Sequence, residues 1–158
     1  MTGNKLNAQI FSLGVRAIYV GPAFNVSAHR VGVAVLCCGV AGSIEVACDA
    51  RHPSAGWVTC RTLLIPAGRL HLVRFRAEPI ACLYLDPQST DTERIARAMN
   101  RRRRAFATDH ASEAELLALL WRLVRRELTT QDVNRHVAKL LHLSSPTVKD
   151  ERVEHSGV

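Results

Sequence analysis

A histidine that follows a turn sequence is the clearest chemical feature of this chain: it ends the segment Pro66-Ala-Gly68-Arg-Leu-His71. Proline fixes φ and ends a strand, glycine allows a tight reversal, and a histidine three residues later can point into a cavity. A second histidine, His29, lies upstream, after the pair Gly21-Pro22. Imidazoles at a cavity would orient a bound molecule by hydrogen bonding. For each histidine the simpler alternative is an exposed or internally hydrogen-bonded ring with no ligand role.

Aromatic and cationic side chains of the same half add further candidates. A sugar or an aromatic effector stacks on aromatic rings and is oriented by nearby polar groups. Trp57, which follows the loop at residues 52–56, suits that role, whereas Tyr84 lies between two leucines and equally suits the core. Arg30 and Arg61 are candidates to hold a carboxylate, or they are strand-edge charges that face water.

Motifs for catalysis are missing from the sequence. It has no glycine-rich phosphate loop, no Gly-x-Ser-x-Gly and no His-Glu-x-x-His, and the first half carries few acidic residues. We therefore predict no catalytic residue and no cofactor. The five cysteines are expected to be reduced and to act as small core residues; if the adjacent Cys37 and Cys38 lie in a strand, they point to opposite faces.

The elements that would position these side chains are strands in the first half of the chain. Short apolar runs are separated by Gly, Pro and Ser punctuation, a pattern typical of an antiparallel sandwich or barrel. The run at residues 31–38 does not alternate, which predicts burial on both faces. The expected strands are residues 17–20, 31–38, 43–48, 57–65, 71–76 and 80–85.

Helices are expected after Pro87. Capping boxes at residues 90–93 and 112–115 predict one helix to about Arg103 and a second over residues 113–128; Thr130 is expected to cap a third over residues 131–142. The second helix carries an apolar stripe wide enough to pair with the same helix of a second subunit, although it could simply pack on the strands. The residues predicted for this dimer interface are Leu116, Leu117, Leu120, Leu123 and Val124.

Charge and hydropathy limit the possible locations and partners. The net charge is +7, and residues 101–104 are four consecutive arginines, which could contact DNA phosphates or form the solvated end of a helix. The longest apolar runs are too short to span a membrane, and the first residues lack the features of a signal peptide. These observations predict a cytoplasmic protein with no membrane partner.

The motifs occur in an order that resembles a known family. Gly21-Pro22, His29, the Pro66–His71 segment and the sequence Leu83-Tyr-Leu-Asp-Pro87, followed by a helical hairpin, are similar to the N-terminal domain of AraC-type transcription regulators. The sequence Asp150-Glu-Arg-Val153 resembles the segment that leads into the helix-turn-helix half of such regulators. The resemblance covers about residues 18–142.

This resemblance implies a cupin-like double-stranded β-helix, or jelly roll, followed by two or three helices. It predicts an N-terminal arm at residues 1–16, an effector-binding barrel at 17–88, a helical dimerisation region at 89–143 and a linker at 144–158. DNA would be bound only through a helix-turn-helix domain that this chain lacks.

The implied function is the sensing of a small-molecule effector by a homodimer, and the implied ligand-binding residues are His29, Arg30, Trp57, Arg61, His71 and Tyr84.

A metal-binding cupin has more ligands than this chain offers. Val31 stands where the family's second histidine would be, and Val35 lies near the position of its glutamate. Two imidazoles are too few for a zinc, manganese or iron enzyme site. The resemblance therefore predicts His29 and His71 as cavity-lining residues and no metal ligand. The alternative function is a metal-dependent cupin enzyme, such as an isomerase or a dioxygenase, with a further ligand that the sequence does not identify.

Overall fold

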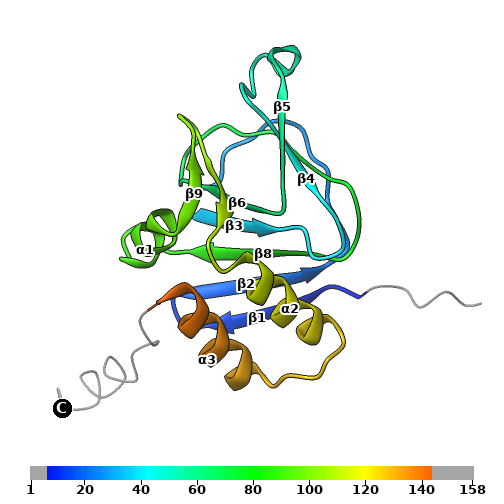
Figure 1. The fold of residues 1–158 in the computed structure, drawn as a ribbon, viewed down its shortest axis with the longest axis vertical. Coiled ribbons are helices and arrows are strands. Elements are labelled where there is room, and N and C mark those ends of the chain that lie inside the picture. The colour runs from blue at the N-terminus through cyan, green and yellow to red at the C-terminus, as the bar shows by residue number, and fades with distance from the viewer. Residues whose placement is uncertain (1–6, 144–158) are drawn as a thin grey trace, which may run out of the picture.

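A computed structural model describes residues 7–143, and within this range the fold is mainly β, with antiparallel sheets and three α-helices (Figure 1). A seven-stranded sheet has the order β1-β2-β8-β3-β6-β10-β9, and a three-stranded sheet has the order β5-β4-β7. The strands of the two sheets are β1 (Gln9–Leu13), β2 (Arg16–Gly21), β3 (Ala34–Cys38), β4 (Ile44–Ala47), β5 (Trp57–Cys60), β6 (Thr62–Ile65), β7 (Val73–Phe75), β8 (Ile80–Leu85), β9 (Met99–Arg102) and β10 (Ala107–His110). The helices are α1 (Asp91–Arg97), α2 (Glu113–Val124) and α3 (Thr130–Leu141), and a 3₁₀ turn covers Pro53–Ala55.

Strand β3 separates two hydrophobic cores. All five of its residues are buried. Val35 and Cys37 belong to the core between the two sheets, whereas Leu36 and Cys38 belong to the core under the helices. The prediction of burial on both faces is confirmed for residues 34–38, where Cys37 and Cys38 point to opposite faces. Residues 31–33, which the prediction included, precede the strand and are not buried.

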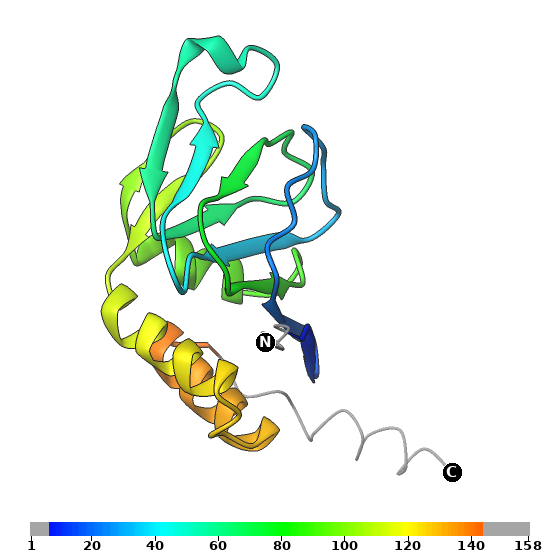
Figure 2. The ribbon, with the colours of Figure 1, turned by 90° about the vertical axis from the view of Figure 1, so that its right-hand side faces the viewer.

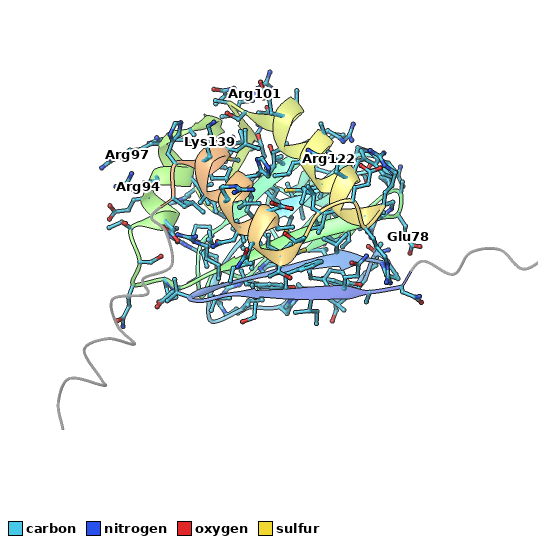
Figure 3. All side chains as sticks on the ribbon, turned by 90° about the horizontal axis from the view of Figure 1, so that it is seen from below. Glu78, Arg94, Arg97, Arg101, Arg122 and Lys139 are labelled. Carbon is cyan, nitrogen blue, oxygen red and sulfur yellow. The ribbon has the colours of Figure 1, made fainter. Side chains whose placement is uncertain are left out.

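Helices α2 and α3 cover the outer face of the seven-stranded sheet, over β1 and β2 (Figure 2). Seen from below, they lie across that face, and the exposed side chains of Arg122 and Lys139 project from them (Figure 3). The helical hairpin therefore closes one side of the sheet, and the three-stranded sheet closes the other.

The apolar stripe of α2 is mostly internal. Leu116, Leu120 and Leu123 are 2%, 3% and 1% exposed, and they pack on the sheet with α3. This corrects the prediction that these three residues form a dimer interface, because the chain's own strands already cover them. Leu117 and Val124, from the same prediction, are half-buried.

Residues 7–16 do not form a separate arm. Residues 1–6 lie outside the described range, and Gln9–Leu13 is the edge strand β1, paired with β2 across a tight turn at Gly14. Phe11 packs against the core under the helices. The predicted boundary at residue 16 is therefore wrong, and the linker predicted at 144–158 lies outside the described residues.

The arginine run lies at the end of a strand and in the turn that follows it, and not at a helix end. Helix α1 ends at Arg97, and Met99–Arg102 pairs with β10, which pairs in turn with β6. These two strands extend the large sheet, so the helical region predicted from residue 89 contains a β-hairpin. The expected helix to Arg103 is wrong because the sheet edge supplies partners for these backbone groups.

None of the three predicted helix caps is the cap that the structure shows. Neither Thr90 nor Ser112 makes a side-chain cap. The Ser112 N–H donates instead to Nδ1 of the buried His110 (2.9 Å). Helix α3 has a full capping box, but its cap is Thr129, which exchanges hydrogen bonds with Asp132, and not Thr130.

No helix among the described residues is long and apolar enough to cross a membrane.

Candidate ligand-binding site

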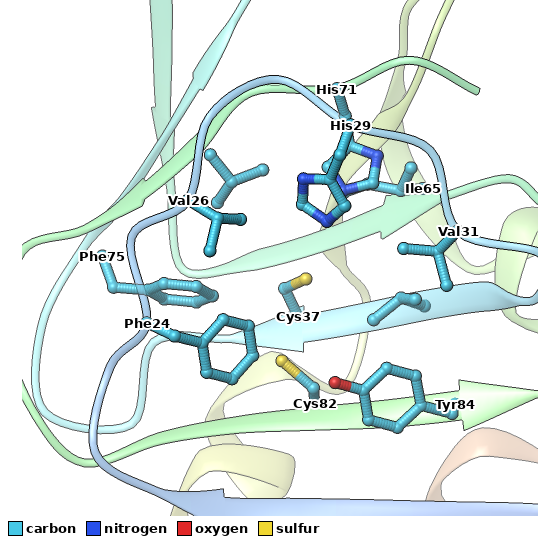
Figure 4. A pocket seen from close by; sticks show the side chains of 12 residues that line it. Phe24, Val26, His29, Val31, Cys37, Ile65, His71, Phe75, Cys82 and Tyr84 are labelled. Carbon is cyan, nitrogen blue, oxygen red and sulfur yellow. The ribbon is translucent and has the colours of Figure 1, made fainter. Parts of the chain in front are cut away.

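A cavity of about 60 Å³ lies between the two sheets (Figure 4). Its lining is mostly apolar, and its polar groups are two imidazoles, two thiols and a phenol. Phe24 and Val26 line it from the loop between β2 and β3 while remaining 38% and 48% exposed. The lining residues are Phe24, Val26, His29, Val31, Val35, Cys37, Ile65, His71, Val73, Phe75, Cys82 and Tyr84.

His29 and His71 lie side by side on one wall of this cavity (Figure 4). The His29 N–H donates to the His71 carbonyl (3.0 Å), and the His71 N–H donates to the His29 carbonyl (2.9 Å). Their ring centroids are 4.4 Å apart, with the ring planes inclined at 59°. The backbones therefore fix the separation of the two imidazoles.

A turn at Gly68 brings His71 into this position. Gly68 has φ of +75°, a conformation that glycine adopts without the steric cost of a Cβ. Its N–H donates to the Val31 carbonyl (2.8 Å), and its own carbonyl accepts from Nη1 of Arg30 (2.8 Å). The turn predicted from the Pro66–His71 spacing is thus present, and it is bound along its length to the segment that carries His29.

Backbone carbonyls also orient both imidazoles. Nδ1 of His29 lies 3.0 Å from the Ser27 carbonyl, and Nδ1 of His71 lies 3.0 Å from the Arg69 carbonyl. A carbonyl only accepts hydrogen bonds, so each Nδ1 carries the proton. In the neutral ring Nε2 then holds a lone pair, which can accept a hydrogen bond from a ligand. Burial lowers the pKa of His71 below 6.5, so this ring is neutral at pH 7.

Two thiols and a phenol line the cavity from the large sheet. Cys37 and Cys82 are direct partners across β3 and β8. A hydrogen bond with Cys82, together with burial, raises the pKa of the Cys37 thiol well above its usual value. Burial likewise raises the pKa of Tyr84. The Cys37 thiol and the Tyr84 phenol are therefore protonated at neutral pH and present weak donors and acceptors rather than nucleophiles.

Aromatic rings form the wall opposite the histidines. Phe24 packs edge-on against Phe75 (centroids 5.9 Å apart) and Tyr19 (5.3 Å). The Asn25 side chain accepts from the Phe75 N–H (3.1 Å), and Glu78 accepts from the Ala23 N–H (3.1 Å). These bonds hold the loop between β2 and β3 over the cavity.

Three of the six predicted ligand-binding residues, His29, His71 and Tyr84, line the cavity. Arg30 lies beside it and lines a neighbouring groove.

Trp57 and Arg61 are not at the cavity, which corrects their predicted role. Trp57 lies on β5, with the Arg74 guanidinium 4.4 Å from its ring centroid. Arg61 breaks residues 57–65 into two strands of different sheets, and its guanidinium donates to the carbonyls of Gly39 (2.7 Å) and Val40 (2.9 Å). Both side chains are held by structural contacts.

Several residues that line the cavity are not predicted from the sequence. Cys37 and Cys82 were assigned to the core, and their cross-strand pairing emerges only from the register of β3 and β8. Phe24 and Val26 lie in a loop where no periodicity marks an inward face. The signal for them was present in the composition, because two large apolar residues stand between Pro22 and His29 without a strand pattern.

Among residues 7–143, no group of three or more His, Cys, Asp or Glu side chains is arranged to hold a metal ion. No protein-family model matches the chain, and no curated protein matches it. What the site can do chemically therefore follows from its geometry. It offers a mostly apolar cavity, two oriented imidazoles and a phenol, which together suit reversible binding of a small molecule.

Proposed function

We propose that this chain is the effector-sensing and dimerisation part of a bacterial AraC-type transcription regulator, with a cupin-like jelly roll that binds a small molecule. The observation that carries the proposal is the cavity bounded by the paired His29 and His71, with exposed Phe24 and Val26 at its edge. Exposed apolar side chains around a concave, mostly apolar site with a few polar groups are typical of ligand binding. Both histidines stand at the positions that carry the family resemblance.

The mechanism that follows is a population shift. A ligand in the cavity contacts the loop between β2 and β3 and the floor formed by β3 and β8. The opposite face of β3 packs under α2 and α3. A ligand that binds one arrangement of this layer more tightly favours that arrangement, and the helical hairpin then transmits it to a DNA-binding domain.

Dimerisation would use the side of α2 that the sheet leaves half-covered. Leu117, Trp121 and Val124 recur at helical spacing there and are all half-buried. A second copy packed against this row would bury the remaining apolar area.

Light scattering across a dilution series tests the dimer. The expected mass is twice 17.4 kDa. The double variant Leu117→Asp/Val124→Asp should shift it to the monomer, whereas the control Val15→Asp, at an exposed apolar residue of the β1–β2 turn (56% exposed), should not. A monomer at every concentration contradicts this part of the proposal.

The sensing role is tested by thermal unfolding of the full chain with a panel of sugars, amides and short carboxylic acids. A ligand raises the midpoint when it binds only the folded state. The variant His71→Ala should remove the effect, because it removes one of the two oriented imidazoles. If no compound protects the native chain, or if protection survives in the variant, the histidine site is not the sensor.

The alternative of a metal-dependent cupin enzyme rests on the oriented imidazoles, since metal-binding histidines commonly donate Nδ1–H to a backbone carbonyl. Elemental analysis of the purified chain separates the two functions. Stoichiometric metal in the native chain that is lost in His29→Ala favours the enzyme. A native chain that purifies without metal favours the sensor.

A further inference from the structure

A groove of about 560 Å³ lies next to the cavity, on the other side of His71. Four arginines line it: Arg30, Arg51, Arg69 and Arg104. They come from four separate segments: the loop before β3, the turn after β4, the Gly68 turn and the β9–β10 turn. The fold therefore gathers cations that are far apart in the sequence.

The groove has little negative charge of its own to balance these cations. Asp49 is the carboxylate in its lining, and Oδ1 of Asp49 accepts from the Arg51 backbone N–H (2.9 Å), which stabilises the turn. Within residues 7–143 none of the four guanidinium groups forms an ion pair, whereas Arg101, on the neighbouring strand β9, pairs with Asp109 (3.2 Å). Four unpaired guanidinium groups around one groove create a positive potential that attracts anions.

Guanidinium groups also select the shape of the anion. Arginine presents planar, paired N–H donors that match the two oxygens of a carboxylate or a phosphate. Arg30 spends one donor on the Gly68 carbonyl (2.8 Å), which fixes its direction beside His29. A guanidinium has five N–H donors, so Arg30 can hold the turn and bind an oxyanion together.

The groove and the cavity adjoin at His71, which lines both. The cavity, at about 60 Å³, is much smaller than the groove, at about 560 Å³. It therefore accepts a short apolar group, and the larger groove accepts the rest of a ligand. His71 stands where the apolar part of such a ligand would meet its polar part.

From these observations we infer that the effector is a small organic anion, whose carboxylate or phosphate binds the arginine groove while a short apolar group enters the cavity beside His29 and His71. This inference rests on the proposed sensing function and names its ligand class. The occupant is a small molecule because the groove adjoins a mostly apolar cavity of about 60 Å³, which the backbone of a nucleic acid does not fill.

The test compares matched ligands on the full chain by NMR titration at low ionic strength. The anions are butyrate and propyl phosphate, and the neutral counterpart of butyrate is butanamide. We expect at least one anion to bind about tenfold or more tightly than butanamide. We also expect 0.5 M NaCl to weaken the binding of the anion but not the binding of the amide, because salt screens exposed charges. The two anions together show which oxyanion the groove prefers.

The variant Arg69→Gln/Arg104→Gln removes two groove charges at exposed side chains and should weaken anion binding about tenfold. The control Arg97→Gln/Arg103→Gln removes the same charge from exposed positions outside the groove and should change the affinity for the anion less than twofold. The thermal unfolding midpoint of each variant is also measured, so that a loss of binding caused by a folding defect is recognised.

Three results would overturn the inference. If butanamide binds the cavity as tightly as butyrate, the sensing function stands and the ligand class is wrong. If neither anion binds the native chain, the groove is not an oxyanion site, and the sensing function is then decided by neutral compounds alone. If only a DNA duplex binds and the groove variant abolishes that binding, the groove serves a polyanion instead.

Discussion

The backbones of His29 and His71 exchange two hydrogen bonds, of 3.0 and 2.9 Å, so that two loops distant in the sequence form one rim of the cavity. The contact between the two imidazoles follows from this bridge rather than from the rings themselves. Side-chain substitutions at either histidine should therefore alter binding while the rim stays in place.

Gly68 is predicted to be required for the turn that carries His71. Its φ of +75° is strained for residues with a Cβ, although a Cβ there would meet nothing within 4 Å. Gly68→Ala should therefore lower the free energy of unfolding by about 1–2 kcal/mol through backbone conformation alone, and Gly68→Asn by less. Urea unfolding measures both. Gly32→Ala is the matched control, since that site is also open and φ there is not positive; a loss at Gly32 as large as that at Gly68 would contradict the argument.

The buried ion pair between Arg16 and Asp91 is predicted to join the β1–β2 hairpin to α1. Both side chains are 1% exposed. Asp91→Asn or Arg16→Met alone leaves one buried charge uncompensated, and each should cost about 3–5 kcal/mol. The double variant Arg16→Met/Asp91→Leu should recover much of that loss in thermal or urea unfolding. If the losses of the two single variants simply add in the double variant, the two charges are not coupled.

Thr129 is predicted to be the cap that starts α3. Its hydroxyl accepts from the Asp132 N–H (3.1 Å), and the Thr129 N–H donates to the Asp132 carboxylate (3.3 Å). Thr129→Ala should cost about 1 kcal/mol in urea unfolding. The neighbouring Thr130→Ala changes the same residue type one position inside the helix and should cost little. Equal losses for the two variants would show that the cap is not at Thr129.

Acid should destabilise the fold through its buried histidines. Burial lowers the pKa of both His71 and His110 below 6.5 in the folded chain. The unfolded chain then binds more protons than the folded chain below about pH 6.5. Stability is therefore full above that pH and falls as the pH drops through the folded pKa values.

Urea unfolding at pH 7.5 and 5.5 measures this loss. The variant His71→Gln/His110→Gln should show a smaller loss than the native chain, and the exposed His52→Gln serves as the control. An unchanged pH dependence in the double variant would assign the effect to other groups.

The elements that the sequence predicts well are those with apolar patterning on both sides of the sheet. Ile80–Leu85 has the expected bounds because Pro79 and Pro87 enclose an apolar run whose residues face two cores. The double burial of β3 follows from its lack of alternation. The Pro66–His71 spacing predicts the turn that presents His71, because proline and glycine each have one physical use there.

The elements that the sequence does not predict lie at sheet edges, where apolar patterning is weak. Strand β1 exposes Ile10 (74%), and in β9 the last three residues, an asparagine and two arginines, are exposed, so neither strand shows the apolar alternation of a half-buried strand. Partner strands supply their hydrogen bonds, and sequence periodicity does not report partners. Trp57 and Arg61 were misassigned because the chain changes sheets between β5 and β6, which no local pattern marks.

The central claim is that the cavity beside His29 and His71 binds a small molecule, and NMR chemical-shift mapping of the full chain with butyrate tests it most directly. We expect chemical-shift changes concentrated at Cys37, His71 and Tyr84. These changes should disappear in Val26→Trp, because the larger side chain fills the cavity from an edge position that is 48% exposed. Shifts confined to other regions, or shifts that persist in Val26→Trp, would contradict it.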